Sequence, residues 1–144
     1  MHSINSIILR FSILYGLNQP KGIVPLFIKN ISMGKTIKLN EDGLQIRDYI
    51  FIDDVAEIIE RILKSSQQSK TYNFCNATPI SLVKLIRIIG DVVNVKPKVE
   101  LTNNFRVGDI RHIYLDNKKL LNDYKFTFNN LNEGITKMLN GSYG

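Results

Sequence analysis

Two arginines have neighbours that suit the binding of an anion. Arg47 opens a run of aromatic and β-branched residues, and Arg106 stands two residues before Gly108 in a polar stretch. A guanidinium presents a planar fork of N–H donors that matches two phosphate oxygens, and glycine allows a close approach of backbone to ligand. A salt bridge from Arg47 to Asp48, or to another carboxylate, uses the same residue types. Asp109 can orient Arg106, contact a ligand hydroxyl or shape the loop.

Other reactive side chains have simpler interpretations. Asp53 and Asp54 form a carboxylate pair at the expected start of a helix, where they can cap it, with Glu57 completing a capping box. We expect capping rather than acid–base catalysis. His112 has no assigned nucleophile as partner, so we expect a surface or packing role. Cys75 alternates with apolar neighbours, which predicts a buried, inert thiol, neither disulfide nor metal ligand, in a cytoplasmic protein.

The amino-acid composition limits which classes of protein this chain can belong to. The chain has 144 residues, of which 44% are hydrophobic and 22% charged, which is typical of a folded domain. The net charge is +6, but the lysines are scattered, so we expect a solvated surface and no nucleic-acid partner. No apolar run is long enough to cross a bilayer, and the first ten residues lack a secretory pattern, so we expect no membrane partner.

Hydrophobic spacing predicts alternating strands and helices, and therefore an α/β fold. Residues 7–14 form a nearly continuous apolar run, typical of a strand buried on both faces of a parallel sheet. Only six residues precede this run, too few to cover both faces of such a strand. Further strands are expected at 36–39, 49–52, 71–75 and 98–101, and helices at 24–34, 53–63, 82–89, 116–121 and from Asn129 or Asn130 onwards.

Three sequence blocks together resemble one known family. Residues 9–16, LRFSILYG, resemble its L-R-x-x-N-V-Y-G block; residues 47–56, RDYIFIDDVA, resemble R-D-Y/F-I-x-V-x-D-V/L-A; residues 106–112, RVGDIRH, resemble R-x-G-D-x-R-x. These are signatures of the NAD-dependent sugar epimerases and dehydratases, the extended short-chain dehydrogenases/reductases that include UDP-glucose 4-epimerase. The resemblance covers nearly the whole chain, but only the C-terminal half of the family.

The resemblance implies a fold and a site. It implies the C-terminal part of an extended Rossmann-type fold, with residues 1–16 as a residual strand of the dinucleotide-binding sheet and residues 17–144 as a small mixed substrate-binding lobe with amphipathic helices. In the family, arginines at the positions of Arg47 and Arg106 hold the diphosphate of a nucleotide-sugar, and Asp109 belongs to the same region. Two guanidinium groups suit two phosphates.

The departures from the family pattern concern the cofactor and the catalytic groups. The intact family uses NAD, yet this chain has no G-x-x-G-x-x-G motif, no Y-x-x-x-K pair ahead of residues 9–16, where the family carries it, and Ile13 in place of the usual asparagine. The sequence therefore assigns no catalytic and no cofactor-binding residue, and predicts an inactive polypeptide when alone. We expect a dinucleotide-binding half in trans, or self-association; the alternative is a non-catalytic nucleotide-sugar binding or regulatory module.

Overall fold

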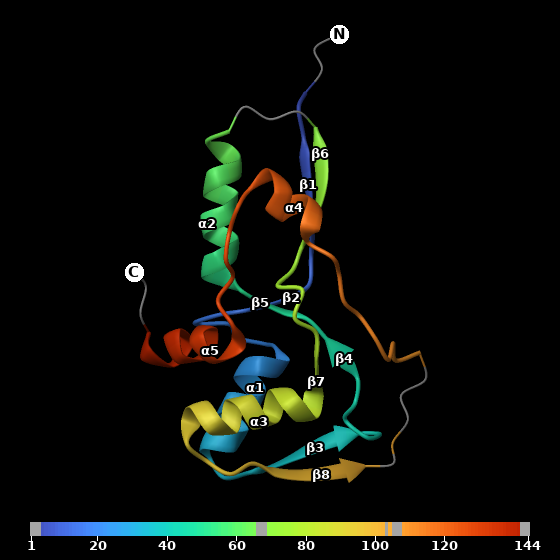
Figure 1. Ribbon diagram of the computed structural model, residues 1–144. Helices are drawn as coiled ribbons and strands as arrows, with labels where there is room; N and C mark the ends of the chain where they lie inside the picture. Colours follow the sequence, from blue (N-terminus) through green and yellow to red (C-terminus); the bar gives the residue numbers. More distant parts are fainter. Residues whose placement is uncertain (1–3, 66–68, 103, 105–107, 142–144) are drawn as a thin grey trace.

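A computed structural model describes residues 4–65, 69–102, 104 and 108–141. The chain is a mixed α/β structure (Figure 1). Its elements in order are β1 (Ile7–Phe11), β2 (Ile13–Tyr15), α1 (Ile23–Ser32), β3 (Thr36–Asn40), β4 (Ile46–Arg47), β5 (Tyr49–Phe51), α2 (Ile52–Leu63), β6 (Lys70–Phe74), β7 (Ile80–Ser81), α3 (Leu82–Val93), β8 (Lys98–Thr102), α4 (Lys118–Asp123) and α5 (Leu131–Asn140).

Two hydrophobic cores organise these elements. One lies between the parallel pair β1–β6 and the helices α2 and α4, and its buried residues include Ile58, Tyr72 and Leu120. The other lies among α1, α3, α5 and the parallel pair β3–β8, and includes Phe27, Leu85 and Ile135. Figure 1 shows β1, β6 and α2 at one end of the molecule and α1, α3, β3 and β8 at the other. Strands β2 and β5, also parallel, connect the two ends.

Local sequence signals placed most of these elements. The apolar stripe of α1, Val24, Phe27, Ile28 and Ile31, is buried as expected. The predicted cap Ser81 accepts a hydrogen bond from the Lys84 backbone N–H at 3.2 Å. Asn130 caps α5 and completes a capping box with Glu133. These signals succeed because a cap and a helical stripe depend on residues three or four positions apart.

Two predictions about local structure need correction. The 7–14 run, expected as one strand, divides at Ser12 into β1 and β2. The expectation that both of its faces would not be covered is confirmed, because Ile8 is 56% and Phe11 41% exposed. Within the described residues, β1 pairs only with β6, so one side of the strand stays open. The aspartates do not cap α2: its N-cap is Phe51, without a side-chain cap hydrogen bond, and Asp54 is instead buried.

The expected boundary between the residual sheet strand, residues 1–16, and the substrate-binding lobe, residues 17–144, stays a prediction.

Among the helices of the described ranges, none combines the length and the apolar character needed to cross a bilayer. Over the same ranges, no three histidine, cysteine, aspartate or glutamate side chains are placed to hold a metal ion together.

Candidate functional site

The two-residue strand β4 carries Arg47 and joins segments that lie far apart in the sequence. On one side β4 pairs antiparallel with β7. On the other, the Ile46 N–H donates to the Arg111 carbonyl at 2.8 Å, and the Ile113 N–H donates to the Ile46 carbonyl at 3.0 Å. The loop that contains Asp109 is thereby fixed along β4, beside Arg47.

The Arg47 guanidinium is held by three oxygens. It donates to an Asp109 carboxylate oxygen at 3.1 Å, to the Ile46 carbonyl at 2.8 Å and to the Arg111 carbonyl at 3.3 Å. Its side chain is only 14% exposed, and that of Asp109 is 30% exposed. Partial burial strengthens such a pair relative to one in bulk water. The guanidinium therefore has a defined orientation, which is what recognition of an oxyanion requires.

Asp48 does not pair with Arg47; of the two salt bridges considered from the sequence, the structure contains the one to another carboxylate, Asp109. Asp48 is 1% exposed and accepts hydrogen bonds from the backbone N–H groups of Ala77, at 3.0 Å, and Thr78, at 3.4 Å. Burial raises the pKa of its carboxyl, while these hydrogen bonds oppose that rise. Asp48 therefore fastens the 77–78 turn to the β4–β5 segment, and Arg47 remains paired with Asp109.

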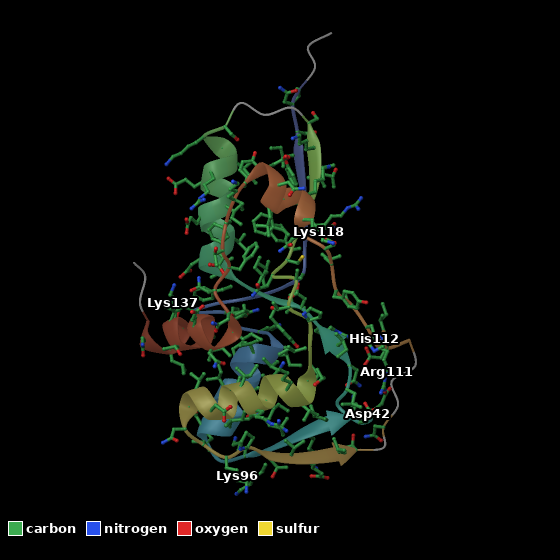
Figure 2. All side chains as sticks on the ribbon, in the orientation of Figure 1. Asp42, Lys96, Arg111, His112, Lys118 and Lys137 are labelled. Carbon is green, nitrogen blue, oxygen red and sulfur yellow. The ribbon has the colours of Figure 1, made fainter. Side chains whose placement is uncertain are left out.

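A second arginine, Arg111, anchors the same loop. Its guanidinium pairs with Glu41 at 3.1 Å and with Asp42, both in the turn after β3. The hydrogen bond from Arg111 lowers the pKa of Asp42, and the same bond raises the pKa of Arg111. Figure 2 shows Asp42, Arg111 and His112 gathered at one side of the molecule near β4. His112 is exposed and meets Ile46 through the backbone, as expected for a surface histidine.

Arg47 and Asp109 line a pocket of about 470 Å³. This volume lies within the usual range of about 300–1,000 Å³ for small-molecule sites. Its lining combines apolar side chains from β2, α1, β3 and α3 with polar side chains. The apolar lining is Ile13, Ile23, Leu26, Phe27, Leu39 and Leu82, and the polar lining is Lys38, Asn40, Gln45, Arg47, Tyr49 and Asp109. The pocket suits a ligand that is part anion and part apolar or planar.

Sequence reasoning missed Gln45 and Tyr49 as pocket residues. Gln45 is 3% and Tyr49 1% exposed, and in the described part of the chain neither the Gln45 Oε1 nor the Tyr49 hydroxyl has a hydrogen-bond partner. Burial raises the pKa of Tyr49, so its hydroxyl stays protonated. Buried polar groups without partners are rare and costly. Their position two residues before and after Arg47 was the only signal that the sequence offered.

The remaining predicted residues have different outcomes. Arg106 lies outside the described residues, so its convergence with Arg47 stays a prediction. Asp109, expected to serve Arg106, a ligand or the loop, is paired with Arg47. Cys75 is a free, fully buried thiol, and burial is the main cause that raises its pKa to about 12, which agrees with the expected inert role.

A larger hollow lies away from these groups. It measures about 610 Å³, and α3 and the segment from Asn94 to Val99 line it, including Arg87 and Lys96. We assign the candidate site to the smaller pocket, because that pocket holds an oriented, partly buried guanidinium. Size alone does not define a site; a few convergent polar groups do.

The strand-to-helix turn before α2 does not suit the diphosphate of NAD. A dinucleotide diphosphate binds at a glycine-rich turn between a parallel strand and a helix N-terminus. The helix that directly follows the parallel strand β5 is α2, and it carries Asp53 and Asp54 in its first turn. The negative charge of these carboxylates disfavours binding of the negatively charged diphosphate at the N-terminus of α2.

The fold and pocket define an α/β chain with a candidate site for an anionic ligand, and comparison with known proteins gives the family. Residues 1–75 match the sequence profile of the NAD dependent epimerase/dehydratase family. This match covers more than half of the 144 residues. The chain therefore belongs to the NAD-dependent epimerase/dehydratase family.

Individual relatives agree with this assignment. The chain is 32% identical to dTDP-L-rhamnose 4-epimerase of Burkholderia thailandensis over 76% of this chain and 31% of that protein. It is also 32% identical to UDP-glucuronate 4-epimerase of Thermodesulfobacterium geofontis, over 85% of this chain and 39% of that protein.

Solved structures share the fold. UDP-glucose 4-epimerase of Thermotoga maritima, crystallised with UDP-glucose, matches with a TM-score of 0.81 and 21% identity over 95% of this chain and 45% of that one. UDP-glucose 4-epimerase of Thermus thermophilus, crystallised with NAD, matches with a TM-score of 0.80 and 23% identity over 97% of this chain and 48% of that one. The chain thus spans less than half the length of these relatives.

Proposed function

We propose that this chain binds the diphosphate of a nucleotide-sugar in the 470 Å³ pocket. Arg47 donates to a phosphate oxygen, Asp109 holds the guanidinium in place, and Arg106 supplies the second positive group. The observation that carries the proposal is the Arg47 side chain, which is 14% exposed, lines the pocket and is fixed on Asp109 at 3.1 Å. Arginine binds phosphate oxygens in pairs, so an oriented guanidinium favours a phosphate over a single hydroxyl.

The mixed lining supports a nucleotide-sugar as the ligand class. Apolar side chains accommodate a planar base, whereas polar side chains suit phosphates and hydroxyls. The named relatives act on dTDP- and UDP-linked sugars, and the Thermotoga structure contains UDP-glucose. We propose a nucleoside-diphosphate sugar and leave the base and the sugar open, because the pocket residues do not select one.

We also propose that this chain supplies the substrate side of the family reaction and not the hydride carrier. NAD, where bound in an intact family member, accepts and returns a hydride. The groups of this chain act before that step: Arg47 orients the diphosphate, and the apolar side chains of α1 exclude water from the base. With no glycine-rich dinucleotide motif and no Y-x-x-x-K pair ahead of residues 9–16, we expect no epimerase or dehydratase turnover from the chain alone.

Calorimetric titration tests the proposal. UDP-glucose, UDP and UMP are titrated into the full chain, and binding should weaken from UDP to UMP because one phosphate is lost. Arg47→Ala and Arg106→Ala should each lower the affinity for UDP about ten- to a hundredfold, the effect of losing about 1.5–3 kcal/mol from a charged hydrogen bond. Unchanged affinity in both variants would refute a diphosphate clamp.

A matched control distinguishes binding of the anion in this pocket from binding through the net charge of the whole chain. Arg87→Ala removes the same charge from the lining of the other hollow, on α3. It should leave the affinity for UDP unchanged. If Arg87→Ala weakens binding as much as Arg47→Ala, the anion binds through the overall charge of +6 and not through this pocket.

A further inference from the structure

Asp48 is a buried carboxylate that follows Arg47 directly but is not among the described residues that line the pocket. It is 1% exposed, and in the part of the chain that the structure describes no lysine or arginine pairs with it. Its donors are the backbone N–H groups of Ala77 and Thr78 and the Cys75 thiol. Burying a charge is costly unless such donors satisfy it. The proposed function gives this carboxylate no task.

The turn that Asp48 holds has an unfavourable backbone conformation. Ala77 has a φ of 58°, in the left-handed region that residues other than glycine rarely adopt. The Asp48 carboxylate accepts from the Ala77 N–H at 3.0 Å and from the Thr78 N–H at 3.4 Å. Hydrogen bonds to a charged group are stronger than those between neutral groups. The carboxylate therefore stabilises a turn that the alanine backbone by itself disfavours.

The same turn leads into the strand that lies beside Arg47. β7 begins at Ile80, and in the antiparallel pair of β4 and β7 Ile80 stands opposite Arg47. Helix α3 follows at once, and the N–H of its first residue, Leu82, donates to the Gln45 carbonyl at 3.3 Å. Figure 1 shows β7 beside β4 and leading into α3. Since Gln45, Arg47 and Leu82 all line the pocket, the turn determines where these three residues lie.

The backbone of Asp48 meets a further segment of the pocket. The Ile13 N–H donates to the Asp48 carbonyl at 3.1 Å, and Ile13 lines the pocket from β2. β4 is only two residues long, so its own ladder offers little resistance to a shift. Asp48 stands directly after β4 and ties it to β2 through the backbone and to the turn before β7 through the side chain.

We infer that Asp48 is a positioning residue for the anion site: by holding the 77–78 turn, its carboxylate keeps β7 on β4 and the Arg47 guanidinium in place at the pocket. This inference rests on the proposed function, because diphosphate binding by Arg47 is the property that Asp48 supports. The three oxygens that hold the guanidinium lie on β4 itself and on the loop along it, so a displaced β4 would loosen these hydrogen bonds. Asp48 acts through Arg47 and does not contact the ligand.

Asp54 provides a matched control for a purely structural role. It is 2% exposed, accepts two hydrogen bonds from Asn129 and lies on α2, outside the described pocket lining. Asp48→Asn and Asp54→Asn each replace a buried carboxylate by an amide of the same shape, whose NH₂ group cannot accept a hydrogen bond.

Calorimetric titration with UDP compares these variants. Asp48→Asn should lower the affinity about tenfold, because one N–H of the turn loses its acceptor and Arg47 loses its fixed position. Asp54→Asn should change the affinity by less than about twofold, because that carboxylate holds no pocket segment. Equal losses in the two variants would overturn the inference, since general loosening of the fold would then explain both.

Ala77→Gly tests whether the turn carries the effect. Glycine adopts a positive φ at little cost, so the turn depends less on the carboxylate. Adding Ala77→Gly to Asp48→Asn should restore the UDP affinity to within about threefold of wild type, and Ala77→Gly alone should leave it unchanged. A double variant that binds as weakly as Asp48→Asn would refute the role of the turn. If neither variant that carries Asp48→Asn folds by circular dichroism while Asp54→Asn does, Asp48 supports the whole fold and the inference is wrong.

The Arg47 guanidinium gives a measurement that needs no ligand. Its two NH₂ groups have different acceptors, so their NMR signals, identified by their absence in Arg47→Ala, should be separate in the wild type. Rotation of a loosened guanidinium should average them in Asp48→Asn, whereas Asp54→Asn should keep them separate. Separate signals in Asp48→Asn would contradict a positioning role.

These measurements also distinguish the two proposals. If the wild-type chain does not bind UDP, the proposed function fails, and the NMR signals still decide whether Asp48 holds Arg47. If the wild type binds UDP and Arg47→Ala weakens this binding, but Asp48→Asn binds as the wild type does, only the positioning role is refuted.

Discussion

Asp54 is a buried carboxylate whose partner can be removed in a controlled way. It is 2% exposed and accepts hydrogen bonds from the Asn129 backbone N–H at 2.9 Å and from the Asn129 side-chain amide. Asn129→Ala removes the side-chain donor and keeps the backbone donor. We expect the free energy of unfolding at pH 7 to fall by about 1–3 kcal/mol, the cost of leaving a buried polar group short of a partner.

The loss of unfolding free energy should depend on pH, and the direction of this dependence follows from the folded-state pKa of Asp54. Burial raises this pKa; the hydrogen bonds from Asn129 and the charge of Lys137 lower it, and Glu57 raises it. Removing the Asn129 amide therefore raises the folded-state pKa of Asp54 further. A carboxyl with a raised folded pKa destabilises the fold above that pKa, and the penalty vanishes as pH falls below the unfolded value of roughly 3.9.

Urea denaturation at pH 7 and pH 4 measures the effect. The difference between wild type and Asn129→Ala should be larger at pH 7 than at pH 4. Asn132→Ala is the matched control, because Asn132 is an exposed asparagine three residues further along, in the first turn of α5. An equal loss for Asn129→Ala at both pH values, or no greater loss than for Asn132→Ala, would refute the account of a buried carboxylate that needs this donor.

Three further predictions concern a cap, a positioning residue and a thiol. Ser81→Ala should lower the free energy of unfolding by about 1 kcal/mol in urea, because α3 loses its cap, whereas Ser81→Asp should retain most of the stability; equal losses would contradict the cap. Asp109→Ala should weaken UDP binding about two- to tenfold in calorimetry, less than Arg47→Ala, since it frees the guanidinium without removing it; a stronger effect than that of Arg47→Ala would show direct contact with the ligand. Cys75 should resist a thiol reagent at pH 8 until urea unfolds the chain, because it is 0% exposed and its pKa is raised to about 12; rapid labelling of folded protein would show that the site opens.

The elements that sequence predicted well share one physical property: their signals are local. The stripe of α1 and the cap of α3 each depend on residues within a few positions, so neither needs knowledge of the tertiary fold. The same local reasoning failed at α2. Asp54 has the residue type and position of a cap, but it lies on the buried side of the helix and meets Asn129, which is 75 residues away.

The candidate site could be predicted only in part. The sequence singled out Arg47 and Asp109 as anion-site residues, but separately, and it offered Asp48 as an equal partner for Arg47. It did not indicate that Gln45 and Tyr49 would be buried with polar atoms lacking partners beside the same pocket. Burial of a polar atom depends on all of its neighbours in space, which the spacing along one segment does not contain.

The sequence by itself determined the family, through three short blocks in order, and the positions of most helices and strands, through local periodicity. Only the tertiary structure decided that Arg47 pairs with Asp109 across 62 residues and that Asp48 accepts hydrogen bonds from the 77–78 turn. The physical reason is that helix caps and stripes arise within a few residues, whereas ion pairs, pockets and sheet edges arise from the packing of distant segments.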